Sequence, residues 1–298
     1  MIKRLAANID KRNWQARIEF ARSGYPASSC SDVHFYEDDE CLIRYRQAGR
    51  GPKLVLVCDP PATLEVYDQL FDVLTDSFTV IAFEIPGNGF SIPKSGFSFA
   101  FLPSNDAIAR FLRACVGEGA ILAFSCGASF AALDIAARYP ALCESLVLMQ
   151  APSWQEEQKW KKGRDSTGII GVPFVGQLLF PRMMVKRAPD WFELCMGVPE
   201  VVAHCSTCAA AAFRHGAAFS LPSMFQSYLA GDKTPFERPE QPATVLWGLM
   251  DKSHALTDKA SSRELAKNVN LVTFENVGHF PELENPRQFK GALMKHVG

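Results

Sequence analysis

The sequence predicts an α/β fold in which a mostly parallel sheet carries helices on both faces. Two observations lead to this prediction. Short, continuously apolar runs, typical of strands buried on both faces of a sheet, alternate with amphipathic segments. The alternation also stops at Pro152 and resumes at Ala243, which indicates an insertion at the end of a strand, where α/β sheets hold their ligand sites.

The first half of the chain supplies a hairpin and then the predicted parallel strands. Residues 33–36 and 41–45 are expected to form two strands, joined by the acidic turn at 37–40. Apolar runs predict further strands at 53–58, 78–85, 120–125 and 145–150. Apolar residues at helical spacing predict helices at 64–74, after Ser104 as an N-cap, and at 126–138.

The alternation continues after the insertion. Strands are expected at 244–249 and 271–276, with a helix near 258–268 between them. A final helix is expected to start at Pro286, because proline is favoured in the first turn of a helix. Its buried face is predicted to carry Phe289, Leu293 and Met294.

These elements divide the chain into three parts. We expect an N-terminal lead at 1–32, a core made of 33–152 and 241–298, and a helical cap at 153–240 that lies over the sheet as a lid. In the lead, Trp14, Ile18 and Ala21 form an apolar stripe, which predicts a helix packed on the domain.

The composition narrows the class of protein. Of the 298 residues 48% are hydrophobic, which is enough for a large buried core. The formal net charge is −1 and basic residues are not clustered, so we expect neither a nucleic-acid nor a membrane partner. The N-terminus has no apolar stretch typical of a secretory signal, and the nine cysteines are scattered. We therefore expect a cytoplasmic protein without a disulfide framework.

A serine stands where a predicted buried strand meets a helix. Ser125 has small residues, Ala123 and Gly127, two positions before and after it, as a sharp strand-to-helix turn requires. Such a turn exposes a nucleophilic hydroxyl above the sheet. A serine that merely caps the helix is the plainer interpretation. Cys126 is a rival nucleophile, but we disfavour it because its flanking residues would be the bulkier Phe124 and Ala128.

A base and an acid follow at matching positions. His279 lies in the loop after the last predicted strand, and Asp251 lies directly after the strand before it. Both loops are expected at the same edge of the sheet as Ser125. We predict that His279 accepts the Ser125 proton and that Asp251, rather than Glu84 or Asp59, orients the imidazole. A surface histidine and an aspartate in an Asx turn are the plainer alternatives.

Three motifs in this order resemble the α/β-hydrolase superfamily, in particular its capped members. They are the serine turn, the segment Phe83-Glu84-Ile85-Pro86-Gly87-Asn88-Gly89-Phe90-Ser91, and the segment Gly278-His279-Phe280-Pro281-Glu282-Leu283-Glu284-Asn285-Pro286. The second is similar to D-x-P-G-x-G-x-S with Glu in place of Asp. The resemblance extends from about Val33 to the C-terminus and implies an α/β-hydrolase fold with a Ser125–Asp251–His279 triad.

One motif departs from this pattern. The family usually carries His-Gly-X after the third strand, with X donating an N–H to the oxyanion, whereas this chain has Cys58-Asp59-Pro60-Pro61-Ala62. Proline has no N–H to donate. We expect Cys126 N–H to serve as one donor, and either Ala62 or Thr63 to supply a substitute for the other, or no second donor to be present. Asp59 would repel an oxyanion unless its carboxylate turned away.

These residues predict a serine hydrolase that acts on an ester, thioester or activated ketone of a small, largely apolar substrate. Asp59, Pro60, Phe124 and Phe280 adjoin the motifs and are expected to line the substrate site. No metal or organic cofactor is implied, and a homodimer is left open. Two alternatives remain because of the proline loop. They are lyase, cyclisation or cofactor-free oxygenase chemistry on the same fold, and a non-catalytic protein that binds a ligand.

A second cysteine pattern, at 204–208, does not predict a metal site. His204-Cys205-Ser206-Thr207-Cys208 contains a C-x-x-C, but a zinc site needs a second pair of ligands at matching spacing. We expect these to be buried helix cysteines.

Overall fold

The computed structural model describes residues 1–10, 33–57, 59–214 and 220–298. The predicted stripe of Trp14, Ile18 and Ala21, and also Cys58, lie outside the described residues. Within the described part, the chain begins with helix α1 (Ile2–Asp10). No described helix is long and apolar enough to cross a lipid bilayer.

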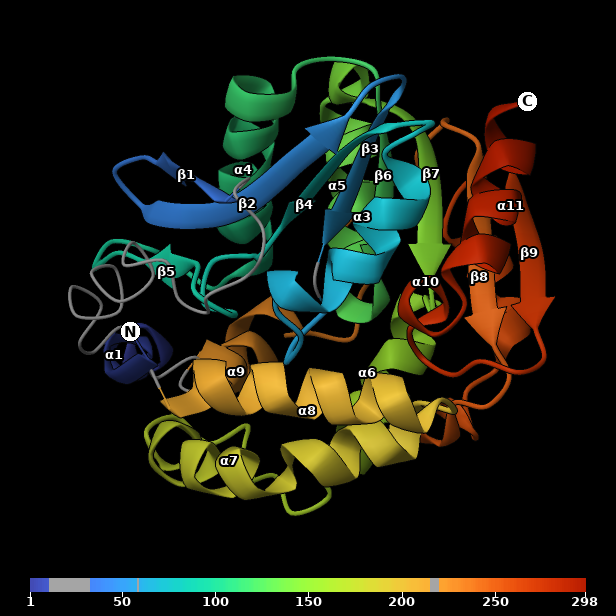
Figure 1. Ribbon diagram of the computed structural model, residues 1–298. Helices are drawn as coiled ribbons and strands as arrows, with labels where there is room; N and C mark the ends of the chain where they lie inside the picture. The colour runs from blue at the N-terminus through green and yellow to red at the C-terminus, as the bar shows by residue number, and fades with distance from the viewer. Residues whose placement is uncertain (11–32, 58, 215–219) are drawn as a thin grey trace.

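In the described part of the chain, a nine-stranded sheet forms the centre of the protein (Figure 1). Its strand order is β1-β2-β4-β3-β6-β7-β8-β9, with β5 paired to β2. The hairpin strand β2 runs antiparallel to β1, β4 and β5, and the remaining neighbours are parallel. The strands are β1 (Val33–Glu37), β2 (Cys41–Gly49), β3 (Lys53–Val57), β4 (Thr79–Phe83), β5 (Ile92–Pro93), β6 (Ala120–Ser125), β7 (Cys143–Met149), β8 (Ala243–Gly248) and β9 (Val269–Phe274).

Helices cover both faces of this sheet, which confirms the predicted α/β fold. In Figure 1, α3 (Asp68–Leu74) and α11 (Pro286–Val297) lie in front of the sheet, and α4 (Phe101–Phe111) and α5 (Ser129–Arg138) lie behind it. All six residues of β6 are buried, because both faces of this central strand are covered. The shorter helical segments of the core are η1 (Leu64–Tyr67), η2 (Leu112–Val116), η3 (Cys126–Ala128), η4 (Pro140–Leu142), η7 (Lys252–His254), η8 (Lys259–Glu264) and α10 (Pro281–Glu284).

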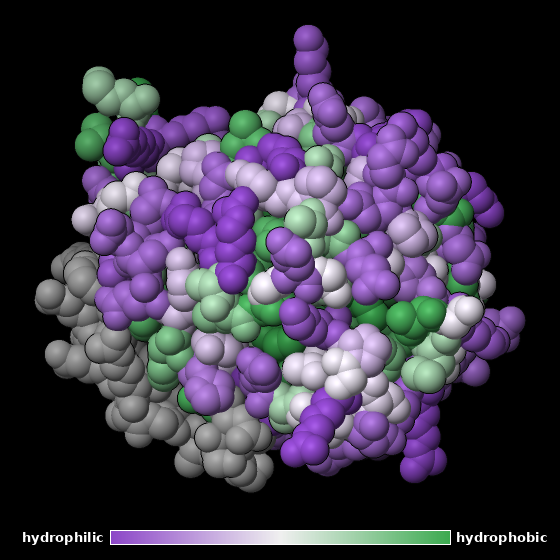
Figure 2. Space-filling view, turned by 90° about the horizontal axis from the view of Figure 1, so that it is seen from above, coloured by the Kyte–Doolittle hydropathy of each residue, from purple (hydrophilic) through white to green (hydrophobic). Residues whose placement is uncertain are grey.

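The described residues between β7 and β8 form helices that we call the cap helices. They are α6 (Trp154–Arg164), α7 (Val175–Cys195), α8 (Pro199–Arg214), α9 (Ser220–Ser223) and η6 (Met224–Tyr228). In Figure 1, α7 and α8 cross the end of the sheet toward which the arrows of β7, β8 and β9 point. The boundaries of a separate cap at 153–240 stay a prediction. The opposite end of the molecule, seen from the top of Figure 1, is mostly hydrophilic (Figure 2).

Some predicted helix features are wrong. Helix α4 starts at Phe101 instead of after Ser104. Pro103 is tolerated because it falls in the first turn, where a backbone N–H has no partner within the helix. The helix expected near 258–268 is only η8, capped by the Asp258 side chain. On α11, Phe289 and Leu293 are buried four residues apart, whereas Met294 turns outward and is 51% exposed.

Buried charges hold the loop that resembles the second motif. Arg44 on β2 donates to Glu84 (Nη1 to Oε1, 3.1 Å) and to Glu65, and all three side chains are buried. Glu84 also accepts from the backbone N–H groups of Leu64 (3.1 Å) and Phe90 (2.7 Å). Burial raises the pKa of Glu84 to about 7, although the charge of Arg44 opposes this shift. Glu84 is therefore a structural anchor of two loops.

Removal of the Arg44 charge should strongly destabilise the fold. We expect Arg44→Leu to lower the free energy of unfolding by about 3–5 kcal/mol, because it leaves Glu65 and Glu84 buried without their cation. Urea unfolding at neutral pH measures this loss. The control is Arg50→Leu at an exposed position, where a change of about 0.5 kcal/mol or less is expected. A loss below about 1 kcal/mol in Arg44→Leu would contradict the prediction.

Candidate active site

Three predicted site segments meet at one edge of the sheet. The turn at Ser125 and Cys126 ends β6, Asp251 follows β8, and His279 follows β9. These are the carboxyl ends of parallel strands, the edge where α/β sheets hold their ligands. The cap helices cross this same edge (Figure 1). The structure therefore brings the predicted segments together under the cap helices.

The turn after β6 places Cys126 at its apex. Ser125 is still in an extended conformation (φ −103°, ψ 145°), whereas Cys126 has a φ of +48°. A non-glycine residue rarely adopts this left-handed region, and a strained turn of this kind carries the nucleophile of an elbow between a strand and a helix. Phe124 does not obstruct the turn, because its buried ring packs against Phe83 in the core. The steric argument against Cys126 is therefore wrong.

Ser125 lies one residue earlier and faces a different partner. Its side chain is fully buried, and its hydroxyl donates to Glu282 Oε1 at 3.3 Å. Among the described residues, the structure shows no hydrogen bond between Ser125 and His279. The expected serine–histidine contact is thus not made. The physical reason is the turn itself, which directs successive side chains to different sides.

His279 and Asp251 are in direct contact. His279 Nδ1 lies 2.7 Å from Asp251 Oδ2, and both side chains are fully buried. The Asp251 carboxylate also accepts from Gln150 Nε2 (2.9 Å) and from the Ser253 N–H (2.7 Å). Burial would raise the pKa of Asp251, but the charge and hydrogen bond of His279 outweigh it and hold the pKa well below its usual range.

Close backbone contacts fix the loops that carry this pair. A Cβ on Gly248 would lie 1.8 Å from the Gly278 carbonyl oxygen, and one on Gly278 would lie 2.1 Å from the Cys195 oxygen. Only glycine fits at such close approaches. The Cys195 carbonyl at the end of α7 also accepts from the His279 N–H at 2.8 Å. A cap helix therefore helps to hold the histidine loop.

A second carboxylate faces the other nitrogen of the same imidazole. Asp59 Oδ2 lies 3.4 Å from His279 Nε2, which has no well-aligned hydrogen bond among the described residues. Burial opposes protonation of His279, but Asp251 and its other neighbours raise the imidazole pKa well above its usual value. Burial also raises the pKa of Asp59, and the contact with His279 opposes that shift. His279 thus lies between two carboxyl groups, and Asp251 in particular favours its protonated form.

In the loop that contains Asp59, the Ala62 N–H is not free to act as the expected substitute donor. The Ala62 N–H donates to the Asp59 carbonyl at 2.8 Å and so closes a turn. Because this N–H is already bonded, the prediction that Ala62 binds an oxyanion is wrong for this structure. Pro60 is half-buried and, like any proline, has no N–H. The peptide bond between Pro60 and Pro61 is cis.

The other two residues that we expected to line the substrate site lie in the core. Phe124 is fully buried, and its carbonyl accepts from the Ser129 hydroxyl. Phe280 is 1% exposed and packs edge-on against the His279 ring, with centroids 4.9 Å apart. Phe280 therefore supports the imidazole, and Phe124 anchors the turn from the far side.

Sequence reasoning missed several buried polar groups around Cys126. Glu157 comes from the first turn of α6, His254 from η7 and Glu282 from α10. Burial raises the pKa of Glu157 and of Glu282 to about 8 and, with the charge of His279, lowers that of His254 to about 3. Glu157 and His254 each lie a few residues after a predicted strand, and Glu282 lies inside the recognised histidine motif. These positions near the strand ends and the motif were the signal that could have found them.

Comparisons with known proteins identify the family and the fold. Residues 61–286 match the alpha/beta hydrolase fold family. The chain belongs to this family. A comparison with curated proteins finds no significant match.

Solved structures show the same fold at low identity. A protein from a Nostoc species described as an alpha/beta hydrolase is 17% identical, with a TM-score of 0.76 over 89% of this chain and 97% of that one. A haloalkane dehalogenase variant from Bradyrhizobium elkanii is 17% identical, with a TM-score of 0.67 over 89% and 95%. A protein from Acinetobacter baumannii described as a lipase is 18% identical, with a TM-score of 0.64 over 96% and 97%.

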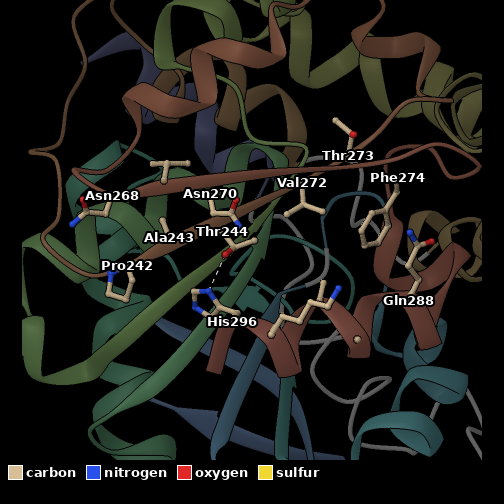
Figure 3. Close-up of a pocket in the computed structure, with 14 residues that line it drawn as sticks. Pro242, Ala243, Thr244, Asn268, Asn270, Val272, Thr273, Phe274, Gln288 and His296 are labelled. Atoms are coloured by element: carbon tan, nitrogen blue, oxygen red, sulfur yellow. Dashed lines mark hydrogen bonds between the residues drawn. The ribbon is translucent and has the colours of Figure 1, made fainter. Parts of the chain in front are cut away.

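The hydrolase also has a groove away from this site. It has a volume of about 780 Å³ and lies between β9 and α11, beside the start of β8 (Figure 3). In Figure 3, His296 and Thr244 point toward each other, and His296 Nδ1 lies 2.9 Å from Thr244 Oγ1. Thr244 is at the amino end of its strand, whereas Asp251 follows the carboxyl end. The groove is therefore separate from the candidate active site.

Glu282 should make the stability of this hydrolase depend on pH. Its folded-state pKa of about 8 exceeds its usual value of 4.5. Between these values the unfolded chain loses a proton that the folded protein keeps, so the contribution to stability falls as pH rises. We compare the free energy of unfolding of Glu282→Gln with that of the unmodified protein. We expect this difference to shift in favour of the variant by about 1 kcal/mol or more between pH 5 and pH 8, since one pKa unit corresponds to about 1.36 kcal/mol.

Urea unfolding at the two pH values measures this difference. The control is Glu264→Gln, an exposed position where no pH-dependent gain is expected. An equal effect of Glu282→Gln at both pH values would show that the folded protein does not keep this carboxyl protonated.

Proposed function

We propose that this hydrolase cleaves an ester or thioester of a small, largely apolar acyl group, with Cys126 as the nucleophile. The observation that carries the proposal is the position of Cys126. It occupies the left-handed apex of the turn after β6, and its Sγ, a ring nitrogen of His279 and a carboxylate oxygen of Asp59 lie within 4.8 Å of one another. The serine route predicted from sequence lacks the corresponding contact.

The reaction begins with transfer of the Cys126 proton to neutral His279, while sulfur attacks the substrate carbonyl carbon. Burial and the charges of Asp59 and Glu157 raise the pKa of Cys126 to about 12, so the thiol needs this base. The leaving group departs with a proton from His279 and leaves an acyl-cysteine. A water molecule, deprotonated by His279, then releases the acid. Asp251 holds the imidazole in the required tautomer.

A backbone N–H of the turn itself donates a hydrogen bond to the oxyanion. In an elbow, the residue after the nucleophile donates its N–H, which makes Gly127 the donor here instead of Cys126. Pro60 has no N–H, so the second donor of the family is missing at that position. The loss of one donor typically lowers turnover by about 10²–10³-fold. We therefore propose a slow enzyme for simple activated esters.

The space beside the turn favours a short acyl group. A cavity of about 30 Å³ adjoins Gly127 and Ala128 and is lined mainly by apolar side chains, among them Phe97, Phe99 and Met224. A Cβ added to Gly127 would meet no atom within 4 Å. This volume is comparable to that of one water molecule in the liquid. It would hold no more than a methyl-sized part of an acyl group beside Gly127.

A second candidate function follows from the contact between Asp59 and His279. A histidine with carboxyl groups at 2.7 Å and 3.4 Å can move a proton without a covalent intermediate. Lyase, cyclisation or oxygenase chemistry would use this array. This chemistry would require Asp59 and His279 but not Cys126. The need for Cys126 therefore distinguishes acyl transfer from the second candidate function.

Trapping of the intermediate tests the proposed function. The purified protein is mixed with a p-nitrophenyl ester of a short acid, quenched in acid and digested, and the acylated peptide is located by mass spectrometry. We expect the acyl group on Cys126. The buried Cys205, on α8, is the internal control and should stay unmodified. An adduct on Ser125 would restore the serine mechanism, and turnover without an adduct on either residue would favour the second candidate.

A further inference from the structure

Two buried groups beside Cys126 have no part in the proposed acyl transfer. Glu157 is 1% exposed and His254 is 3% exposed. A carboxylate oxygen of Glu157, a ring nitrogen of His254 and the Cys126 Sγ all lie within 4.8 Å of one another. The three come from different parts of the chain, namely α6, η7 and the turn after β6. The fold therefore assembles sulfur, nitrogen and oxygen atoms at one buried point.

Glu157 and His254 each have a polar atom without a partner within the described residues. Glu157 Oε2 and His254 Nε2 are both buried and without a hydrogen bond. His254 is held by its other nitrogen, which lies 3.0 Å from Thr257 Oγ1, and its ring stacks on Trp160 with centroids 5.3 Å apart. An unsatisfied buried polar group typically costs about 1–3 kcal/mol. One bound ion beside the thiol could satisfy both groups.

We propose that Cys126, Glu157 and His254 bind a divalent cation of the zinc class. Zinc in proteins is bound by cysteine, histidine and carboxylate at about 2.0–2.3 Å, so neighbouring ligand atoms of a tetrahedral site lie about 3.3–3.8 Å apart. The separations here, within 4.8 Å, need only small side-chain shifts. Three protein ligands leave the fourth position to a water molecule.

The charges of the site favour this cation. Asp59 and Glu157 are both buried, at 6% and 1% exposed, and a carboxylate oxygen of each lies within 4.8 Å of the Cys126 Sγ. A divalent cation would compensate the negative charge that these carboxyl groups and the thiolate carry when ionised. When it binds, the Cys126 S–H bond breaks, the proton goes to solvent and a metal–sulfur bond forms. His279 is a poorer ligand, because Asp251 already holds its Nδ1 and Asp59 faces its Nε2.

The site has a consequence for activity, although it does not rest on the proposed function. A cation held by Cys126 occupies the sulfur that would attack the substrate. Bound zinc should therefore switch off acyl transfer, and a chelator should restore it. The cation site and the nucleophile share one atom.

Cobalt substitution tests the site without any substrate. Co²⁺ is added to the metal-free full-length protein, and the near-ultraviolet charge-transfer band of a cobalt–thiolate bond is recorded. We expect a band that is lost in Cys126→Ala. Glu157→Gln and His254→Gln should each weaken binding by about tenfold or more, on the scale of disturbed metal sites. The matched controls are Glu156→Gln on the same helix and His204→Gln on α8, which should bind as the unmodified protein does.

A second measurement uses the unmodified protein alone. Zn²⁺ should protect Cys126 from alkylation by iodoacetamide, with the labelled peptides quantified by mass spectrometry. The absence of a thiolate band together with unprotected Cys126 would overturn the proposal, and so would equal binding by Glu157→Gln, His254→Gln and their controls. When the acyl-trapping experiment is repeated with a chelator added, failure of the proposed function and failure of this site are seen separately.

Discussion

Cys126→Ala is expected to lower turnover of an activated ester or thioester by about 10⁴-fold or more, the scale on which triad enzymes lose activity without their nucleophile. The physical reason is that no other nucleophile stands at the apex of the turn. Ser125 is one residue away, and its hydroxyl is bonded to Glu282. Ser125→Ala is therefore the matched control and should keep most of the activity.

Steady-state kinetics with both variants measure the two effects, and circular dichroism checks that each variant is folded. Because His279 and Cys126 act as a unit, the double variant Cys126→Ala/His279→Ala should be hardly worse than either single one. The reverse pattern, in which Ser125→Ala is inactive and Cys126→Ala is active, would return the nucleophile to the position predicted from sequence.

Asp251→Asn is expected to lower turnover by about 10⁴-fold while the fold is kept. The carboxylate accepts from His279 Nδ1 at 2.7 Å and is itself held by Gln150 and Ser253. An amide in its place can present N–H to the ring and so favours the wrong tautomer. It also removes a charge that raises the pKa of His279, so the remaining activity should rise at lower pH than in the unmodified enzyme.

A pH–rate profile of both proteins measures these two effects together. Asp258→Asn is the control. Like Asp251, Asp258 caps a helical turn with its carboxylate, but the structure shows no hydrogen bond between Asp258 and His279 among the described residues. A mild effect of Asp251→Asn combined with complete loss in Asp59→Asn would instead make Asp59 the essential carboxylate. The second candidate function would then be preferred.

Most of the architecture could be predicted from local patterns. Local patterns located the eight long strands within a few residues. For central strands such as β6 and β8, burial on both faces of the sheet leaves a continuous hydrophobic signal. Weaker signals were less reliable, as η8 and the exposed Met294 show. In both places the spacing of apolar residues fitted a helix with a buried face. The packing of the folded protein then determined which residues became helical or buried.

The sequence by itself placed Asp251 and His279 after neighbouring strands, and parallel strands bring their carboxyl ends to one edge. It also showed that Pro60 cannot donate a hydrogen bond, which follows from covalent structure alone. The choice between Ser125 and Cys126 was different. A shift of one residue in a sharp turn changes which side chain lies at the apex of the turn. The types of the residues do not indicate which of the two registers is adopted.

Only the tertiary structure decided these remaining points. Phe124 packs into the core and Cys126 takes the positive φ, so the sulfur stands at the apex while the Ser125 hydroxyl turns to Glu282. The approach of Glu157 and His254 to the same sulfur was equally hidden in the sequence. The physical reason is that α6 and η7 are remote from the turn along the chain and meet it only when the sheet and the cap helices pack together.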